Sequence, residues 1–385
     1  MLFNFKKVIR IFIIPIYIIL FFFDVFKLTI LSGILPLGII LNIVLIYSGM
    51  WAFINRKLKP INYILPAIII IFYFLLYDSY FFDIIASYTF LPDKWFVYGF
   101  IYTIFIIIFG IRVLNKRKHD KYQTIRTLVV IFVQLFLAFL IPLTMRVLHT
   151  QEYYFSYLWP LQIEYFYPET ILKFPFPFVF YSFAGSLILF PVFALIFGKR
   201  FYCSWICGCG GLAETFGDKW RQLSNKSTKA WQFEKVSIHF SLILAVIGTV
   251  IIIVNYNTNY TIDILNTLAD RFANFYSFIF KFILSGIIGV SFYPTLGSRV
   301  WCRFFCPMAA MLGLIQKLGR FHIRVKIDMC ISCGNCSTYC EMGIDVRAYA
   351  QDNKSFTRAS CVGCGICAHV CPRGVLRLEN KRTKK

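Results

Sequence analysis

Two runs of four cysteines lie near the end of the sequence, and both follow the spacing C-x2-C-x2-C-x3-C. The runs are Cys330, Cys333, Cys336 and Cys340, then Cys361, Cys364, Cys367 and Cys371. Such short spacings let one loop wrap around a cube of iron and sulfide, and the pattern is that of 4Fe-4S cluster ligands. Zinc sites favour two C-x2-C pairs set further apart. The tail therefore predicts two 4Fe-4S clusters, which exchange single electrons.

The fourth cysteine of each run is expected to serve the other cluster, as in two-cluster ferredoxins. The predicted ligand sets are Cys330, Cys333, Cys336 with Cys371, and Cys361, Cys364, Cys367 with Cys340. Pro372 follows the last cysteine as the pattern expects, but Glu341 takes the corresponding place after Cys340. We expect Glu341 to bring a carboxylate near one cluster and to lower its reduction potential.

Two further cysteine pairs belong to a short internal repeat, G-x-R-x-(Tyr or Trp)-C-x3-C. The first copy contains Cys203 and Cys207, and the second contains Cys302 and Cys306. Each copy follows a predicted membrane span, which indicates a parallel repeat of two-span units. On a helix, C-x3-C spacing points both thiols to one face. We therefore expect four thiols to meet where the two copies face each other.

Several interpretations of these four thiols are open. They fit a third metal centre, a redox dithiol or relay, or a site for a soft ion such as Cu(I). They also fit buried cysteines that pack as small apolar residues. Cys209 has no counterpart in the second copy and is a fifth ligand, a resolving thiol or a residue without a role. Glu214 and Asp218 fit either proton transfer beside a quinone or ordinary surface carboxylates.

The composition is that of a polytopic membrane protein. Hydrophobic residues make up 59% of the 385 residues, charged residues only 15%, and there are 44 Phe. A helix needs about 20 apolar residues to cross a bilayer. Eight segments fit: 8–26, 29–54, 61–82, 95–114, 127–148, 177–198, 236–256 and 275–297. The predicted fold is an all-α polytopic membrane protein with a small C-terminal α+β ferredoxin-like domain holding both clusters.

The distribution of Lys and Arg predicts the orientation. Nineteen of them lie in segments 1–10, 55–60, 112–126 and 199–235, and five lie in 24–30, 78–94, 146–176 and 255–274. Positive charge stays inside, so both termini are expected in the cytoplasm and the chain in the cell (inner) membrane. The formal charge of +22 is then assigned to lipid headgroups and not to nucleic acid. Thiols on the cytoplasmic side predict metal ligation and no disulfides.

Three regions follow from this organisation. Residues 1–126 form a four-helix membrane region that serves as a scaffold or docking surface. Residues 127–320 form the membrane core with both C-x3-C pairs, and 321–385 form the cytoplasmic ferredoxin-like domain. The outward loop 149–176 is dense in aromatic residues, which is typical of an interfacial belt. The alternative is that residues of this loop contact a quinone.

The motifs resemble those of the membrane-bound polyferredoxins over residues 127–385. The most specific part is Cys302 to Pro307 together with the eight cysteines of the tail. The first copy departs from the family pattern, because Gly208 stands where the family has proline. The resemblance implies electron transfer at the cytoplasmic membrane, with quinol or a cytoplasmic reductant as donor.

The leading hypothesis is an integral membrane protein that carries single electrons. A cytoplasmic or quinone-pool donor would be linked to a redox partner in or beyond the membrane. The first alternative is a membrane copper reductase that uses the C-x3-C pairs. The second is a redox-sensing assembly factor. The donor, the acceptor and the direction of flow are not encoded in these motifs.

Overall fold

Five helices of the described chain are long and apolar enough to cross a membrane. The computed structural model describes residues 61–78, 81–89 and 91–380. The five helices cover Lys94–Arg117, Lys121–Val147, Phe176–Phe197, Thr228–Asn257 and Asp263–Ser291. They correspond to the last five predicted spans. Helix α4 (Ile61–Asp78) corresponds to the third, whereas the predicted spans 8–26 and 29–54 lie outside the described residues.

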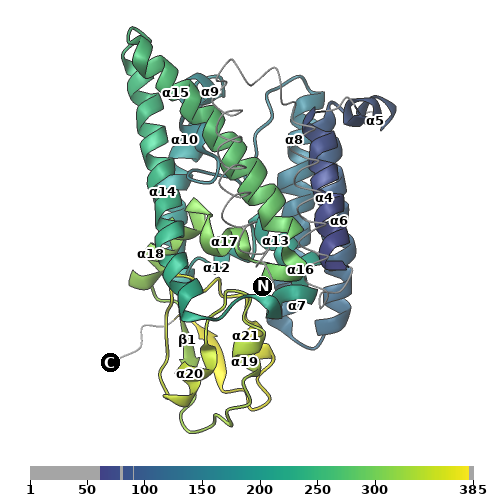
Figure 1. Cartoon of the computed structure of the whole chain (residues 1–385), viewed down its shortest axis with the longest axis vertical. Coiled ribbons are helices and arrows are strands. Elements are labelled where there is room, and N and C mark those ends of the chain that lie inside the picture. Colours follow the sequence, from purple (N-terminus) through teal and green to yellow (C-terminus); the bar gives the residue numbers. More distant parts are fainter. Residues whose placement is uncertain (1–60, 79–80, 90, 381–385) are drawn as a thin grey trace, which may run out of the picture.

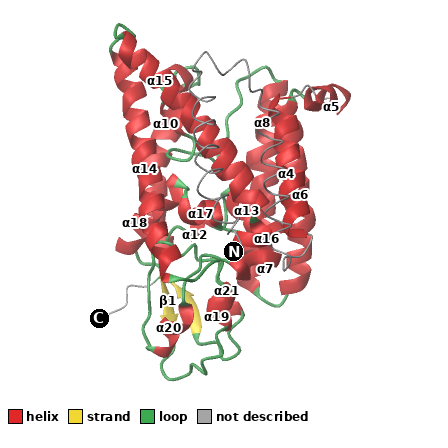
Figure 2. Ribbon diagram, viewed as in Figure 1, coloured by secondary structure: helices red, strands yellow, loops and turns green. Residues whose placement is uncertain are grey.

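Figure 2 shows that helices make up most of the described chain. Three of the five long helices include a wider π-helical stretch. The elements of this part are α5 (Phe81–Thr89), α6 (Lys94–Arg117), α7 (Lys121–Leu135), η2 (Phe136–Leu140), α8 (Ile141–Val147), α10 (Phe176–Ala184), η4 (Gly185–Leu189), α11 (Phe190–Phe197), α14 (Thr228–Asn257), α15 (Asp263–Tyr276) and η6 (Ser277–Ser291). Short helices η3 (Ile163–Phe166) and α9 (Pro168–Ile171) lie between α8 and α10. Local π turns often occur at functional sites, and η6 lines the cavity described below.

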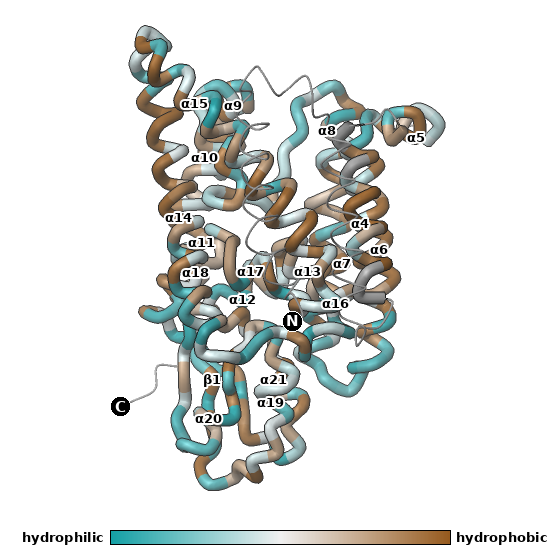
Figure 3. The backbone as a smooth tube through the Cα atoms, in the orientation of Figure 1, coloured by the Kyte–Doolittle hydropathy of each residue, from teal (hydrophilic) through white to brown (hydrophobic). Residues whose placement is uncertain are grey.

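The long helices are rich in apolar residues (Figure 3), and many of these are exposed. Ile108, Ile188 and Val250 are 58%, 64% and 52% exposed. A soluble protein does not expose continuous bands of such residues, so these faces fit contact with lipid. Asp93 and Asp120 begin α6 and α7 by accepting two backbone N–H groups each, which marks where the chain enters each span.

The two described connections rich in Lys and Arg, 112–126 and 199–235, lie beside the ferredoxin-like domain (Figure 1). The end of α6 pairs with the segment after α13, through Lys116 and Arg117 to Asp218. The start of α7 contacts the tail, because Asp120 accepts from His369 Nδ1 at 2.8 Å. Segments 112–126 and 199–235 thus share one side with the tail, as the charge distribution predicts.

The C-terminal domain is α+β, as expected. Strands β1 (His322–Val325) and β2 (Leu376–Glu379) pair antiparallel, with Ile323 opposite Leu378. Its helices are α19 (Asn335–Thr338), α20 (Val346–Gln351) and α21 (Ile366–His369). Gly334 and Gly365 precede α19 and α21 with φ of 79° in both cases. This left-handed conformation, which glycine adopts readily, turns each cysteine loop into its short helix.

The C-x3-C pairs do not lie on continuous helices, contrary to the expectation from their spacing. The junction contains α12 (Arg200–Cys203), α13 (Gly208–Glu214), η5 (Phe216–Leu223), α16 (Tyr293–Leu296), α17 (Val300–Phe304) and α18 (Pro307–Leu318). Cys203 ends α12, and Cys207 precedes α13. Cys302 lies in α17, and Cys306 precedes α18. Gly208 and Pro307 are the first residues of new helices. At Pro307 the reason is local, because proline fits the first helical turn and blocks continuation of the preceding helix.

Candidate iron-sulfur sites

The eight cysteines of the tail are divided between two small cavities. One cavity is lined by Cys330, Cys333, Cys336 and Cys371, and the other by Cys340, Cys361, Cys364 and Cys367. The fourth cysteine of each run therefore lies with the first three of the other run. We name the first group the distal set and the second the proximal set. Cys333 of the distal set is exposed to solvent.

The proximal set is held against the helical part by side chains that bind its backbone carbonyls. Tyr122 Oη donates to Gly363 O at 2.7 Å, and Gln123 Nε2 donates to Cys364 O at 2.9 Å. From other elements, Ser204 Oγ donates to Val362 O at 2.8 Å and Gln316 Nε2 to Cys361 O at 3.0 Å. Each of these bonds fixes the loop that carries the cysteines. The position of the proximal set is therefore determined by the helical part of the chain before residue 321, which we name the membrane half.

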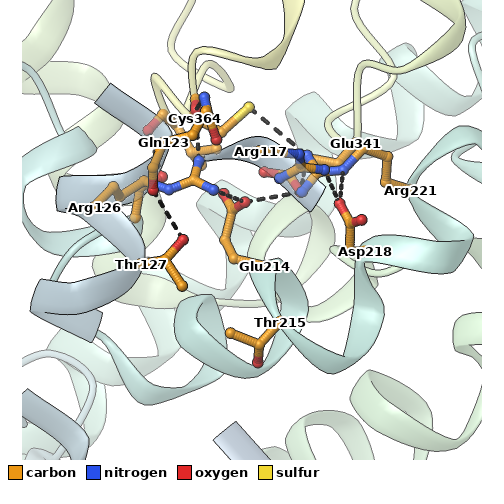
Figure 4. Close-up of polar contacts among 12 residues, drawn as sticks. Arg117, Gln123, Arg126, Thr127, Glu214, Thr215, Asp218, Arg221, Glu341 and Cys364 are labelled. Carbon is orange, nitrogen blue, oxygen red and sulfur yellow. Dashed lines mark hydrogen bonds and ion pairs between the residues drawn. The ribbon is translucent and has the colours of Figure 1, made fainter. Parts of the chain in front are cut away.

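A buried network of arginines and carboxylates lies beside Cys364 of the proximal set (Figure 4). Glu214 pairs with Arg126 at 2.7 Å, Arg221 at 2.9 Å and Arg299 at 2.7 Å. Glu341 pairs with Arg221 at 2.9 Å and Arg299 at 3.1 Å. All five side chains are at most 2% exposed. We name these five residues the junction network.

The junction network contacts sulfur at both ends. Arg221 Nη1 lies 4.0 Å from Cys364 Sγ in the proximal set. Arg299 Nη1 lies 3.8 Å from Cys302 Sγ and donates to Cys203 O at 3.0 Å. Guanidinium groups beside cluster sulfurs favour the anionic state of those sulfurs. The junction network therefore connects Cys364 of the proximal set with Cys302 of the second C-x3-C pair.

The carboxylates Glu214 and Asp218 are buried, so the expectation of ordinary surface carboxylates is wrong. Burial opposes ionisation of Glu214, but three arginines outweigh it and hold the pKa of that carboxyl well below its usual range. Burial likewise raises the pKa of Asp218, and pairing with Arg221, Arg117 and Lys116 lowers it to about 2. Both groups stay ionised, which does not suit proton transfer.

Glu341 lies beside the proximal set, where its place after Cys340 predicts it. The carboxylate does not act on that set alone, however, because Arg221 and Arg299 pair with both of its oxygens. The two guanidiniums compensate its charge. Glu341 thus links the ferredoxin-like domain to the arginines of the membrane half, a role that the sequence analysis did not assign to it.

The structure brings the four cysteines of the two repeats together. Cys203, Cys207, Cys302 and Cys306 are all buried in one cluster of packed side chains. Their thiols interact electrostatically, since ionisation of Cys203, Cys207 and Cys302 would each raise the pKa of Cys306 further above its usual range after burial. Cys209 lies beside Cys207 and is only partly buried. We name the four repeat cysteines the repeat set.

A site for one metal ion requires its ligand atoms to lie close together. A tetrahedral zinc ion brings its sulfurs to about 3.8 Å from one another, because each Zn–S bond is about 2.3 Å. Within the described residues, three metal-ligating atoms approach within 4.8 Å only in the group Glu214, Glu341 and Cys364. Both of its carboxylates are paired with arginines. None of the three cysteine sets forms such a group among the described residues.

A cavity of about 630 Å³ lies between α4, α6, α7, α13 and η6. Its lining includes Cys209 and Cys302 as well as Glu152, Tyr154 and Lys281. More than half of the lining residues are aromatic or aliphatic, and polar and charged side chains lie among them. This volume and lining are typical of a site for a small organic molecule.

The aromatic loop 149–176 does not form an interfacial belt as a whole, contrary to expectation. Tyr153, Tyr165 and Phe166 are at most 7% exposed and pack inside the protein. The loop also reaches the repeat set, because Tyr202 Oη donates to Ser156 O at 2.9 Å. Tyr154 and Tyr157 line the cavity. The loop is thus an inner wall of the membrane half.

Comparison with known proteins agrees with this geometry. A 4Fe-4S dicluster domain model matches residues 329–376, and a 4Fe-4S binding domain model matches twice, at 179–227 and 279–326. The double match confirms the internal repeat, since each match contains one C-x3-C pair. The chain is therefore an iron-sulfur protein with helices long enough to span a membrane.

Its relatives confirm the resemblance to membrane polyferredoxins. The chain is 25% identical over 165 residues to Escherichia coli YccM, whose name proposes electron transport, covering 42% of this chain and 46% of that protein. It is 26% identical over 152 residues to the methylamine utilization ferredoxin-type protein MauN of Methylobacillus flagellatus, covering 38% and 50%. The chain thus spans about half the length of these relatives. No solved structure matches it.

We predict that Glu341→Gln lowers the stability of the cluster-bound protein by about 3 kcal/mol, because it leaves two buried guanidiniums without full compensation. The measurement is the denaturant concentration at which cluster absorbance is lost in detergent. The control is Glu379→Gln, since Glu379 pairs with Arg324, which is 60% exposed, and should change stability by less than about 1 kcal/mol. Equal stability of both variants would contradict the structural role of Glu341.

Proposed function

We propose that this chain is a membrane electron carrier that moves single electrons between a redox partner on the ferredoxin-domain side and the quinone pool or a partner in or beyond the membrane. The observation that supports this best is the series of thiol groups. The distal set includes the exposed Cys333, the proximal set lies against the helices, and the junction network leads to the repeat set. Cys302 then lines the cavity.

The distal and proximal sets are proposed to hold one 4Fe-4S cluster each, and the repeat set a third. Bound clusters supply single-electron transfer. The chain contributes the thiolates and N–H groups near sulfur, such as Val375 N at 3.4 Å from Cys371 Sγ and Ala309 N at 3.4 Å from Cys306 Sγ. The third cluster is supported by the matches of a 4Fe-4S binding domain to both repeat copies.

Iron content tests this assignment. The protein purified without oxygen should contain about twelve irons per chain, four for each cluster. Cys302→Ser should contain about eight and keep the spectra of the tail clusters, because only the repeat set loses a ligand. Cys209→Ser is the matched control and should keep about twelve. About eight irons in the wild-type protein would contradict a cluster at the repeat set.

The cavity is the proposed site for a quinone. Two electrons and two protons separate a quinone from its quinol, so the site needs a redox centre and proton-carrying groups nearby. The hydroxyls of Tyr102 and Tyr157 both lie against Gly208, next to Cys209. Cys302 of the repeat set lies on the same wall. In this proposal the tyrosine hydroxyls exchange protons with the quinone, and the repeat set exchanges electrons with it.

A bulky side chain in the cavity should block this exchange. Ser285 lines the cavity on η6, away from the cysteines in sequence. We expect Ser285→Trp to slow reoxidation of the dithionite-reduced protein by a soluble quinone at least tenfold, measured by stopped-flow absorbance, with unchanged iron content. Val250→Trp is the control, because Val250 lies on the exposed face of α14. Reoxidation at the wild-type rate in Ser285→Trp would count against the quinone site.

The proposed orientation puts the ferredoxin-like domain in the cytoplasm, following the positive charge of 112–126 and 199–235. A protease site inserted at Asn353, in that domain, should be cut only in inverted membrane vesicles. A site inserted at Asn259, in the α14–α15 connection at the other end of the helices, should be cut only in right-side-out vesicles. The reverse pattern would contradict this orientation.

A further inference from the structure

Lys199 is a fully buried cation without a carboxylate partner among the described residues. Its side chain is 0% exposed, and Nζ has no hydrogen-bond partner in the part of the chain that the structure describes. The buried arginines of the junction network, in contrast, each pair with Glu214 or Glu341. Burying an unpaired charge is costly, so a buried ammonium group indicates a source of negative charge nearby.

Two cysteines from different sets lie near this ammonium group. Lys199 has electrostatic interactions with the thiols of both Cys203 and Cys361, and its backbone is hydrogen-bonded to Cys203 directly and to Cys361 through Gln316. Cys203 belongs to the repeat set and Cys361 to the proximal set. Lys199 therefore acts on two separate cysteine groups at once.

Gln316 explains how these two groups are brought to the same lysine. Its Oε1 accepts from Lys199 N at 2.8 Å, and its Nε2 donates to Cys361 O at 3.0 Å. On the other side, Cys203 N donates to Lys199 O at 2.9 Å in the first turn of α12. The backbone of Lys199 is thus fixed to both sets, and Gln316 itself is fully buried.

The second copy of the repeat offers no equivalent charge. Ser298 stands at the position that corresponds to Lys199, between Gly297 and Arg299. A lysine at this position is therefore not required by the fold of the repeat. Its presence in the first copy alone coincides with the side of the repeat set that faces Cys361.

We propose that Lys199 is the counter-cation shared by the clusters of the repeat set and the proximal set, and that its charge raises the reduction potential of both. This inference rests on the proposed assignment of clusters to those sets. Thiolate-ligated clusters are net anions, and reduction adds one electron to each. A fixed positive charge stabilises the reduced form by Coulomb attraction, with no proton moved at Lys199. Lys199 is a positioning residue, since it ligates no iron.

The test is an anaerobic redox titration followed by electron paramagnetic resonance on full-length protein in detergent. Lys199→Met should lower the reduction equilibrium constant of the two flanking clusters at least tenfold, which is about 59 mV for a one-electron couple. The distal cluster should not shift. Lys199→Arg, which keeps the charge, should restore most of the wild-type potential. Lys317→Met is the control, because Lys317 is exposed on α18 next to Gln316.

Salt separates this effect from that of surface charge. Because Lys199 is buried, the difference between wild type and variant should be the same at low and high ionic strength, whereas surface charges are screened. If Lys199→Met does not assemble its clusters, Lys199→Gln is titrated in its place. Unchanged potentials in a variant with full iron content would overturn the inference. A different result would be an iron content of about eight per chain together with a change in the reduction potential of the proximal cluster alone. That result would reject the third cluster and retain the effect of Lys199 on the proximal cluster.

Discussion

The junction network is the interaction on which the arrangement of the rest depends. Its three arginines come from α7, η5 and the start of the second repeat copy, and its carboxylates from α13 and the ferredoxin-like domain. Charges buried this deeply are tolerated only when each is paired, since desolvation of a single ion costs several kcal/mol. Glu341 compensates Arg221 and Arg299 from the other domain. The two halves of the protein therefore depend on each other electrostatically as well as by packing.

This dependence also fixes the geometry that electron transfer requires. The network lies between Cys364 and Cys302, so the residues that neutralise one another also hold the proximal set and the repeat set at a constant separation. Hydrogen bonds from Tyr122, Gln123 and Ser204 also hold the loop of the proximal set in place against the helices. Among the described residues, the distal set makes no such hydrogen bonds with the helices, and it includes an exposed cysteine, which under the proposed function suits exchange with a redox partner. Rigidity is thus concentrated where electrons would pass between sites within the chain.

The features that could be predicted from the sequence are those carried by local spacing. The tail cysteines, the repeat and the apolar spans each depend on residues close together in the chain. Pro307 carries the same kind of local information about a helix break, because proline blocks continuation of the preceding helix. The burial of Glu214 could not be read from its neighbours, because its partners Arg126 and Arg299 lie far away in sequence. The burial of the aromatic loop depends on distant contacts in the same way. Its composition fits a membrane interface, and only the contact with Tyr202 shows that it enters the interior.

The two repeat copies are alike in their cysteines and unlike in their charges, which gives the repeat set an asymmetric environment. Arg200 of the first copy reaches Asn380 at 2.9 Å, whereas the equivalent Arg299 is buried in the junction network. Lys199 is buried on one side of the set, and Ser298 stands at the matching place on the other. A symmetric pair of ligand motifs would favour no side of a bound centre. Because the ferredoxin-like domain packs against this repeat with its own carboxylate and cysteine loops, equivalent positions meet different partners. Under the proposed function, positive charge is therefore concentrated on the side toward the proximal set, and the opposite side is open to the apolar cavity.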